Sequence, residues 1–308
     1  MRFSLTDEQV ALRDAVRELF ASSAPDAVWG ELARMGVFGA LVPESAGGLG
    51  LSDVDVVPIL AEIGYAAPAA PVAETLVAAP LLVGDPRLAS VLSGSTRVAI
   101  AGPSGLIPFG GDLVLLLADQ TVRLVKPTAT EPRATVDPFR PLLSGEFPAG
   151  GAVTADPALV GRRALLATSA QLVGLGRRML DLTVSYVNTR HQFGVPVGSF
   201  QAVKHHLADA LLQLEFAWPA VLAAGWALST GAADAARSVA MASVLASEAA
   251  QLTARTAIQC HGAIGYTVEY ELHRFAKRAW ALAAEVDVDA QVELVASSLH
   301  LSQEGSEP

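Results

Sequence analysis

A helix-breaking corner with one arginine separates two long apolar segments in the C-terminal half of the chain. Arg190 is followed by Gln192 and Phe193, and then by a Gly-x-Pro turn at Gly194 and Pro196. Gly and Pro end a helix because glycine adopts left-handed backbone angles and proline cannot continue the hydrogen-bond ladder. An arginine at such a corner, considered alone, is usually a solvated surface charge.

A second corner follows the helical pattern that ends near Gln259. Gly262 and Gly265 stand there with Ala263 between them. Glycine has no Cβ, so it lets backbone N–H groups approach a diphosphate without a side-chain clash. The alternative interpretation is a turn between two helices that binds no ligand.

The sequences around both corners resemble the signatures of one protein family. Arg-x-Gln-Phe-Gly from Arg190, with Ser-Phe-Gln-Ala-Val-Lys-His from Ser199, resembles the signature between the first two C-terminal helices of acyl-CoA dehydrogenases. The segment from Gln259 is similar to that family's Gln-x-x-Gly-Gly-x-Gly-Phe, with Ala263 in place of the second glycine. Pro-Glu-x-x-Gly-Gly-Leu-Gly-Leu at 43–51 is a third match. The matches follow the family's order, and the resemblance covers residues 3 to about 295.

The resemblance implies a subunit of an FAD-dependent enzyme that desaturates an acyl-CoA thioester between its α and β carbons. In the family, the arginine corner grips the FAD pyrophosphate at a subunit interface, and the glycine corner contacts the FAD of a neighbouring subunit. Carried over residue by residue, this assigns FAD binding to Arg190, Gln192, Phe193, Gln259, Gly262 and Gly265.

The catalytic base does not fall where the family places it. A carboxylate must reach the α-carbon to remove its proton. Registration from Tyr270 puts Val286 at one family position, and Ala164 stands at the other. Glu285, one residue from the first position, is our candidate base. Since one residue rotates a helical side chain by about 100°, an ordinary exposed glutamate and a base from a partner chain stay open.

The middle of the chain departs from the family. Nothing between Arg97 and Ala155 resembles the Thr-Glu-Pro-x-x-Gly-Ser-Asp-like segment that touches the flavin ring and the thioester. Short members of this kind occur in actinobacterial α2β2 enzymes that oxidise steroid side-chain CoA esters. The resemblance therefore implies a homologous partner subunit, or a second copy, and an electron-acceptor flavoprotein. The alternative is a structural or assembly subunit that has lost FAD and substrate.

Elements of three kinds must position these residues. We predict a mainly α fold with a small β domain, divided into an N-terminal helical domain (1–93), a shortened middle β domain (94–155) and a C-terminal four-helix bundle (156–308). Thr6 and Gln9 form a capping box, Asp156 caps the first bundle helix, and Ser199 caps the second. The predicted strands are 97–101, 113–118 and 121–126, with a hairpin turn at 119–120. The first predicted bundle helix follows Asp156 and ends near 189. The next three span 199–229, 232–259 and 268–284.

Composition excludes several classes of function. The net charge of -10 argues against a nucleic-acid partner. The single Cys260 excludes an internal disulfide and fits a reducing cytoplasm. The uncharged run 216–233 is interpreted as a bundle helix and not as a membrane span. Neither Lys204-His205-His206 nor Cys260-His261 has metal or nucleophile spacing, so we expect no metal, surface histidines and a structural cysteine.

Overall fold

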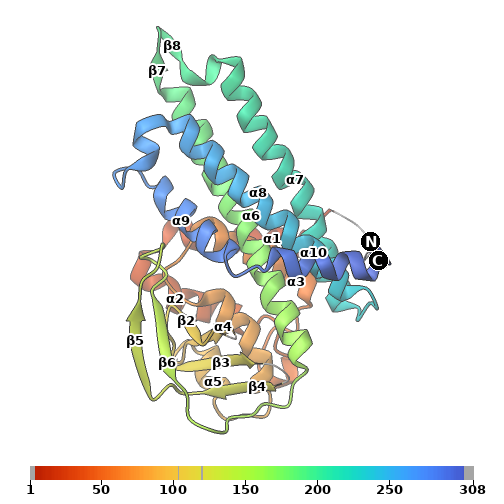
Figure 1. The fold of residues 1–308 in the computed structure, drawn as a ribbon. Coiled ribbons are helices and arrows are strands. Elements are labelled where there is room, and N and C mark those ends of the chain that lie inside the picture. Colours follow the sequence, from red (N-terminus) through yellow and green to blue (C-terminus); the bar gives the residue numbers. More distant parts are fainter. Residues whose placement is uncertain (1–3, 103, 119–120, 302–308) are drawn as a thin grey trace, which may run out of the picture.

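The structure is a computed structural model that describes residues 4–102, 104–118 and 121–301. Figure 1 shows a long helical bundle at one end of the molecule and short helices with two small sheets at the other. The prediction of a mainly α fold with a small β region is confirmed.

The N-terminal segment folds into short helices around a buried third helix. Thr6 and Gln9 form the predicted capping box: Gln9 N donates to Thr6 Oγ1 at 3.2 Å, and Thr6 N donates to Gln9 Oε1 at 3.0 Å. The helices are α1 (Asp7–Ser22), α2 (Pro25–Arg34), α3 (Asp53–Ala66), α4 (Val72–Ala78) and α5 (Leu88–Leu92), with 3₁₀ turns η1 (Val37–Gly39), η2 (Glu44–Ala46) and η3 (Ala79–Leu82).

Two three-stranded sheets pack against each other in the middle region. In the first, β3 lies between β1 (parallel) and β4 (antiparallel); in the second, β6 lies between β2 and β5. Side chains alternate along β3: Leu113 and Leu115 pack toward α5 and η3, whereas Val114 and Leu116 pack toward the second sheet. The strands are β1 (Val98–Ala101), β2 (Leu106–Pro108), β3 (Leu113–Ala118), β4 (Thr121–Val125), β5 (Ala129–Arg133) and β6 (Leu142–Glu146).

Strands β1, β3 and β4 match the three predicted strands, whereas the second sheet was not predicted. Strand β5 is exposed along its whole length and contains Pro132, so it carries no alternating apolar pattern. The predicted hairpin turn at 119–120 lies outside the described residues, although β3 and β4 pair as such a turn requires.

The C-terminal half forms an antiparallel bundle. Asp156 caps its first helix as predicted, because the Asp156 side chain accepts a hydrogen bond of 2.9 Å from Ala158 N. The bundle helices are α6 (Pro157–Thr189), α7 (Gln201–Ser229), α8 (Ala235–His261) and α9 (Leu272–Ala283), and α10 (Val288–Ser298) lies across them. Between them lie β7 (His191–Gln192), β8 (Val195–Pro196), η4 (Val197–Ser199) and η5 (Gly262–Tyr266).

Two predicted helix starts are wrong. Ser199 does not cap α7: a 3₁₀ turn comes first, Phe200 stands at the cap position, and Ser199 Oγ donates to Pro196 O at 2.7 Å. The helix expected from Val268 begins at Leu272, because the chain after α8 continues as the 3₁₀ turn η5.

Helices α3 and α6 cross at glycines. A Cβ on Gly174 would lie 1.9 Å from Ala61 O, and one on Gly64 would lie 2.1 Å from Gln171 O. The two backbones approach this closely because neither glycine has a side chain. The crossing joins the N-terminal helices and the bundle in one hydrophobic core. The predicted domain boundaries at 93/94 and 155/156 stay a prediction.

Helix α7 contains most of the uncharged run. It is long and apolar enough to cross a membrane by length and composition, a test that core helices of globular proteins also pass. In the structure it packs on α8, α6 and α3, with residues such as Ala210, Leu214 and Val221 fully buried. This packing is what the interpretation as a bundle helix requires.

Candidate functional site

The arginine corner forms the tip of the bundle (Figure 1). Helix α6 ends at Thr189, and a short hairpin follows in which His191 pairs with Pro196. The turn residues Phe193 and Gly194 have φ angles of 54° and 83°, so both adopt left-handed conformations. Phe193 is 92% exposed at this turn. A large aromatic side chain held in the open is costly in water and suits a surface that another molecule covers.

Arg190 has a fixed backbone and a free side chain. Its N–H donates to Tyr186 O at 2.8 Å, and its carbonyl accepts from Val197 N at 2.7 Å. Within the described part of the chain, the exposed Arg190 guanidinium forms no hydrogen bond or ion pair. Gln192 is also exposed. The corner thus offers a positive charge and amide groups to an incoming anion.

The glycine corner lies at the C-terminal end of α8. Gly262 has φ 65° and ψ −138°, a conformation that side chains disfavour, and a Cβ there would meet no atom within 4 Å. Gly265 differs, because its Cβ would lie 2.8 Å from Ile258 O. Gly262 therefore faces open space, and Gln259 is exposed, whereas Gly265 is needed for packing against the last turn of α8.

An aromatic stack joins the two corners. The rings of Tyr186 and His261 are stacked with centroids 4.4 Å apart, and Tyr270 packs on both rings. Tyr186 precedes Arg190 by about one helical turn, and His261 directly precedes Gly262. The structure thus brings the two predicted FAD corners to the same end of the bundle.

Burial controls the charge of the residue inside this stack. His261 is 4% exposed, and its Nδ1 lies 2.7 Å from Ala257 O, to which it donates. Desolvation by burial lowers the pKa of His261, and the Ala257 carbonyl partly opposes this shift. The imidazole is therefore neutral near neutral pH.

Glu285 lies away from the tip, on the wall of a cavity. The cavity has a volume of about 700 Å³ and is enclosed by α4, the middle strands, α6 and the turn between α9 and α10. Ala164 lines the same cavity, whereas Val286 is 5% exposed and belongs to the hydrophobic core. The positions of Glu285 and Ala164, far apart in sequence, thus converge on one space.

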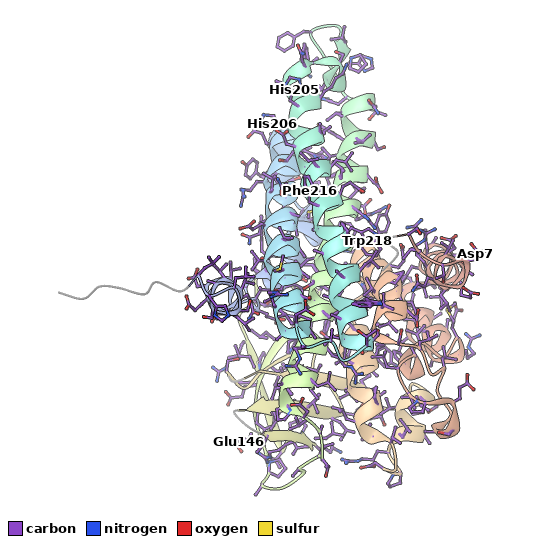
Figure 2. All side chains as sticks on the ribbon, turned by 90° about the vertical axis from the view of Figure 1, so that its right-hand side faces the viewer. Asp7, Glu146, His205, His206, Phe216 and Trp218 are labelled. Atoms are coloured by element: carbon purple, nitrogen blue, oxygen red, sulfur yellow. The ribbon has the colours of Figure 1, made fainter. Side chains whose placement is uncertain are left out.

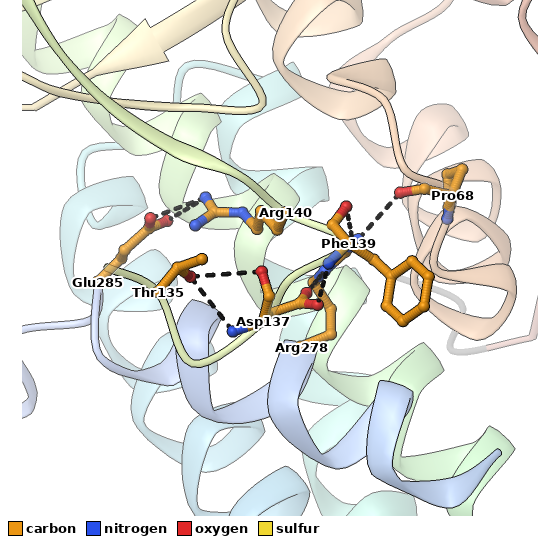
Figure 3. A network of polar contacts seen from close by, with 7 residues as sticks. All are labelled: Pro68, Thr135, Asp137, Phe139, Arg140, Arg278 and Glu285. Atoms are coloured by element: carbon orange, nitrogen blue, oxygen red, sulfur yellow. Dashed lines mark hydrogen bonds and ion pairs between the residues drawn. The ribbon is translucent and has the colours of Figure 1, made fainter. Parts of the chain in front are cut away.

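A polar network fixes the segment between β5 and β6 beside this cavity (Figure 3). The buried Arg278 of α9 pairs with the buried Asp137 and donates to Pro68 O and Phe139 O, each at 3.0 Å. Arg140, in the same segment, pairs with Glu285 at 2.7 Å. One network therefore ties the N-terminal helices, the middle region and α9 together.

Glu74 and Arg140 also line the cavity beside Glu285, and neither was predicted from the sequence. Burial raises the pKa of the Glu74 carboxyl, and the nearby Arg140 and Arg278 oppose the shift only in part. A signal was present: Glu74 is the only charged residue in the apolar pattern 72–82. Arg140 gave no signal, because its role depends on the network.

The other chemically suggestive residues of the sequence are His205, His206 and Cys260. His205 and His206 are exposed on the first turns of α7, as predicted (Figure 2). Burial raises the pKa of the Cys260 thiol, which favours the protonated form, the weaker nucleophile. Among the described residues, no group of three or more His, Cys, Asp or Glu is placed to hold a metal ion.

Comparison with known proteins decides the family. The model "Acyl-CoA dehydrogenase, N-terminal domain" matches residues 6–86, and "Acyl-CoA dehydrogenase, C-terminal domain" matches residues 151–284. Acyl-CoA dehydrogenase IpdE2 of Mycobacterium tuberculosis is 30% identical over 288 residues, which cover 90% of this chain and 88% of that protein. The chain belongs to the acyl-CoA dehydrogenase family. Acyl-CoA dehydrogenase FadE34 of the same organism is 34% identical, but the match covers only 45% of that longer protein.

Solved acyl-CoA dehydrogenases share the fold. The "Tcur3481-Tcur3483 steroid ACAD" superposes with a TM-score of 0.84 at 24% identity over 96% of this chain and 98% of that one. The ChsE4-ChsE5 complex from M. tuberculosis gives a TM-score of 0.85 at 22% identity over 99% and 100%. The fold prediction is confirmed.

FAD is the cofactor of the acyl-CoA dehydrogenase family, as the resemblance implied. The residues at the bundle tip fit its pyrophosphate. The Arg190 side chain has no partner in the described part of the chain, and the space beside Gly262 is open to backbone approach.

Proposed function

We propose that this chain is a subunit of an FAD-dependent acyl-CoA dehydrogenase and that its bundle tip holds the pyrophosphate of a flavin shared with a partner chain. The observation that carries the proposal is the Tyr186–His261 stack, with ring centroids 4.4 Å apart. The stack sets an open glycine corner and an arginine whose side chain has no partner among the described residues at one end of the bundle. A diphosphate needs both a cation and close backbone approach.

The distance between the bundle tip and the cavity supports an FAD that is shared between two chains. Gln171 lines the cavity and Arg190 directly follows the last residue of α6, so about 28 Å of helix lies between them at 1.5 Å per residue. The ribityl chain that joins the pyrophosphate of FAD to its flavin ring spans much less than this distance. An FAD held at the tip would therefore not reach this chain's cavity with its ring, which supports a ring site in another chain.

The chain's own residues prepare the acyl group for reaction. The chemistry that FAD supplies when bound is acceptance of a hydride from the acyl chain. The cavity holds the acyl group away from water, and Glu285 is the candidate to accept the α-proton. The names of the fold neighbours, a steroid acyl-CoA dehydrogenase and a two-component complex, support a steroid side-chain CoA ester and an α2β2 assembly.

A specific observation favours a second candidate function. The family's two base positions hold Val286 and Ala164, and Glu285 is engaged by Arg140. A subunit that supports a catalytic partner without reacting itself would have these features. In this alternative the chain is a structural or assembly subunit that has lost FAD and substrate binding.

The test is the visible spectrum of the purified protein. The chain is prepared alone and together with the product of a neighbouring acyl-CoA dehydrogenase gene, and bound flavin is measured. We expect flavin absorbance in the assembled protein and its loss in Arg190→Met. Arg34→Met is the matched control, because Arg34 is an exposed arginine on α2, far from the tip. Absence of flavin from every preparation, or full retention in Arg190→Met, contradicts the proposal.

A further inference from the structure

Helix α6 contains three glycines, and packing inside the chain explains only two of them. A Cβ on Gly174 would lie 1.9 Å from Ala61 O, and one on Gly176 would lie 2.4 Å from Leu214 Cδ2. A Cβ on Gly161 would meet no atom within 4 Å. Glycine inside a helix lowers stability relative to alanine, because its backbone loses more conformational freedom on folding. Gly161 is thus a destabilising residue that no contact within the described part of the chain requires.

The space beside Gly161 belongs to the cavity of about 700 Å³ described above. Gly161, Ala164 and Thr168 line it and follow one another at spacings of three and four residues, so they lie on one face of α6. Ala281 and Ala284 line it from α9. The cavity is therefore wide because residues with a methyl group or no side chain stand on two of its walls.

The rest of the lining indicates what fills this width. A cavity of this volume lies in the range of sites that enclose most of a small ligand. A narrow, unbranched acyl chain would leave space beside Gly161 and Ala164, and the atoms around that space would lose dispersion contacts. A hydrocarbon ring would supply those contacts. The apolar side chains that would meet it include Val77, Ile100, Leu106, Leu142 and Leu282.

We infer that Gly161 and Ala164 set the width of the acyl group that this cavity accepts, and that they admit a ring-bearing acyl group which larger residues would exclude. This inference rests on the proposed function, because it takes the cavity as the acyl site. The two residues act through the space that they leave and not through contact with the reacting atoms. They are specificity determinants and not catalytic residues.

The test compares two acyl groups that have the same number of carbons and different widths. Nonanoyl-CoA carries an unbranched chain, and 3-cyclohexylpropanoyl-CoA carries a ring. Each is titrated calorimetrically into the purified assembly of this chain with its partner. We expect the ring-bearing ester to bind at least as tightly as the unbranched one. Binding of nonanoyl-CoA with exclusion of the ring-bearing ester overturns the inference and leaves the proposed function standing.

Variants test the width at each position. Gly161→Leu and Ala164→Leu each place a side chain in the cavity, so each should weaken binding of the ring-bearing ester about tenfold or more and that of nonanoyl-CoA by less than about threefold. Gly30→Leu is the matched control, because Gly30 is a helical glycine on α2 whose Cβ would also meet no atom. It should leave both affinities unchanged. Equal losses for the two esters in the cavity variants, or no loss for either ester, overturn the inference.

Urea denaturation separates a filled cavity from a damaged fold. Leucine has a higher helix propensity than glycine, and the position is open, so Gly161→Leu should not lower the free energy of unfolding. A clear loss of stability would show that the space beside Gly161 is not open, and it overturns the inference. If neither ester binds to the folded wild-type assembly, the proposed function fails and the inference fails with it.

Discussion

Arg140 and Glu285 form an ion pair of 2.7 Å although 145 residues separate them in sequence. The pair joins the middle β region to the end of α9, and its two members differ in environment. Arg140 is 5% exposed, whereas Glu285 is 43% exposed and lines the cavity. The buried guanidinium therefore sets the position of a carboxylate that still lines the cavity.

Because Arg140 holds Glu285 in position, Glu285→Gln tests whether Glu285 is the catalytic base. Glutamine retains a hydrogen-bond acceptor for Arg140 but cannot take a proton, so turnover of the flavin-loaded assembly should fall about 10²–10⁴-fold, with flavin content unchanged. Glu293→Gln, an exposed glutamate on α10, should leave turnover unchanged. Full activity in Glu285→Gln would place the base elsewhere, in this chain or its partner.

The Asp137–Arg278 pair predicts a large effect on stability. Both side chains are at most 5% exposed, so Asp137→Ala would leave a buried guanidinium without its counter-ion. We expect the free energy of unfolding to fall by about 3–5 kcal/mol, measured by urea denaturation. Asp14→Ala, which breaks the exposed Arg13–Asp14 pair, should change it by less than about 1 kcal/mol. Similar values for both variants would contradict a structural role for the network.

The helical parts of the fold were predictable because their signals are local. The capping box at Thr6, the Asp156 cap and the apolar periodicity of the bundle each depend on neighbours within a few residues. The predicted Ser199 cap was wrong for the same reason, because it also depended on a local signal. A serine before a helical pattern resembles a cap, but its hydroxyl found Pro196 O in the preceding 3₁₀ turn.

The residues of the candidate site also fall into those with local sequence signals and those without. Arg190 and Gly262 were found because motifs and backbone chemistry mark them. Glu74 and Arg140 become site residues only when α4, the β5–β6 segment and the α9–α10 turn meet at the cavity. Strand β5, with its exposed side chains and Pro132, likewise depends on pairing with β6 and not on its own pattern.

Gly262→Ala tests the open corner. The φ of 65° and ψ of −138° are strained for alanine, although the added methyl would meet no atom within 4 Å. We expect unfolding free energy to fall by about 1–3 kcal/mol, with weaker flavin retention, followed by urea denaturation and visible absorbance. Gly30→Ala on α2 also meets no atom and lacks the positive φ, so it should instead stabilise by about 0.5–1 kcal/mol. Stabilisation by both variants would contradict the strain assigned to Gly262.

His261 predicts how stability depends on pH. Burial lowers its pKa below the ordinary value of 6.5, so the unfolded chain binds a proton more readily than the folded chain. Its contribution to stability is therefore full above about pH 6.5 and is lost as the pH falls below that value, toward the folded pKa. Desolvation lowers the pKa of His273 as well, which adds a loss of the same sign.

His261→Phe separates the two contributions. Phenylalanine can still stack on Tyr186 but cannot take a proton, so the acid-side loss of stability should shrink to the part that His273 and the carboxyl groups contribute. Urea denaturation across the acid range measures the slope for the wild type, for His261→Phe and for the exposed control His205→Phe. We expect the control to follow the wild-type slope. Superimposable slopes for the wild type and His261→Phe would show that burial does not hold this imidazole neutral.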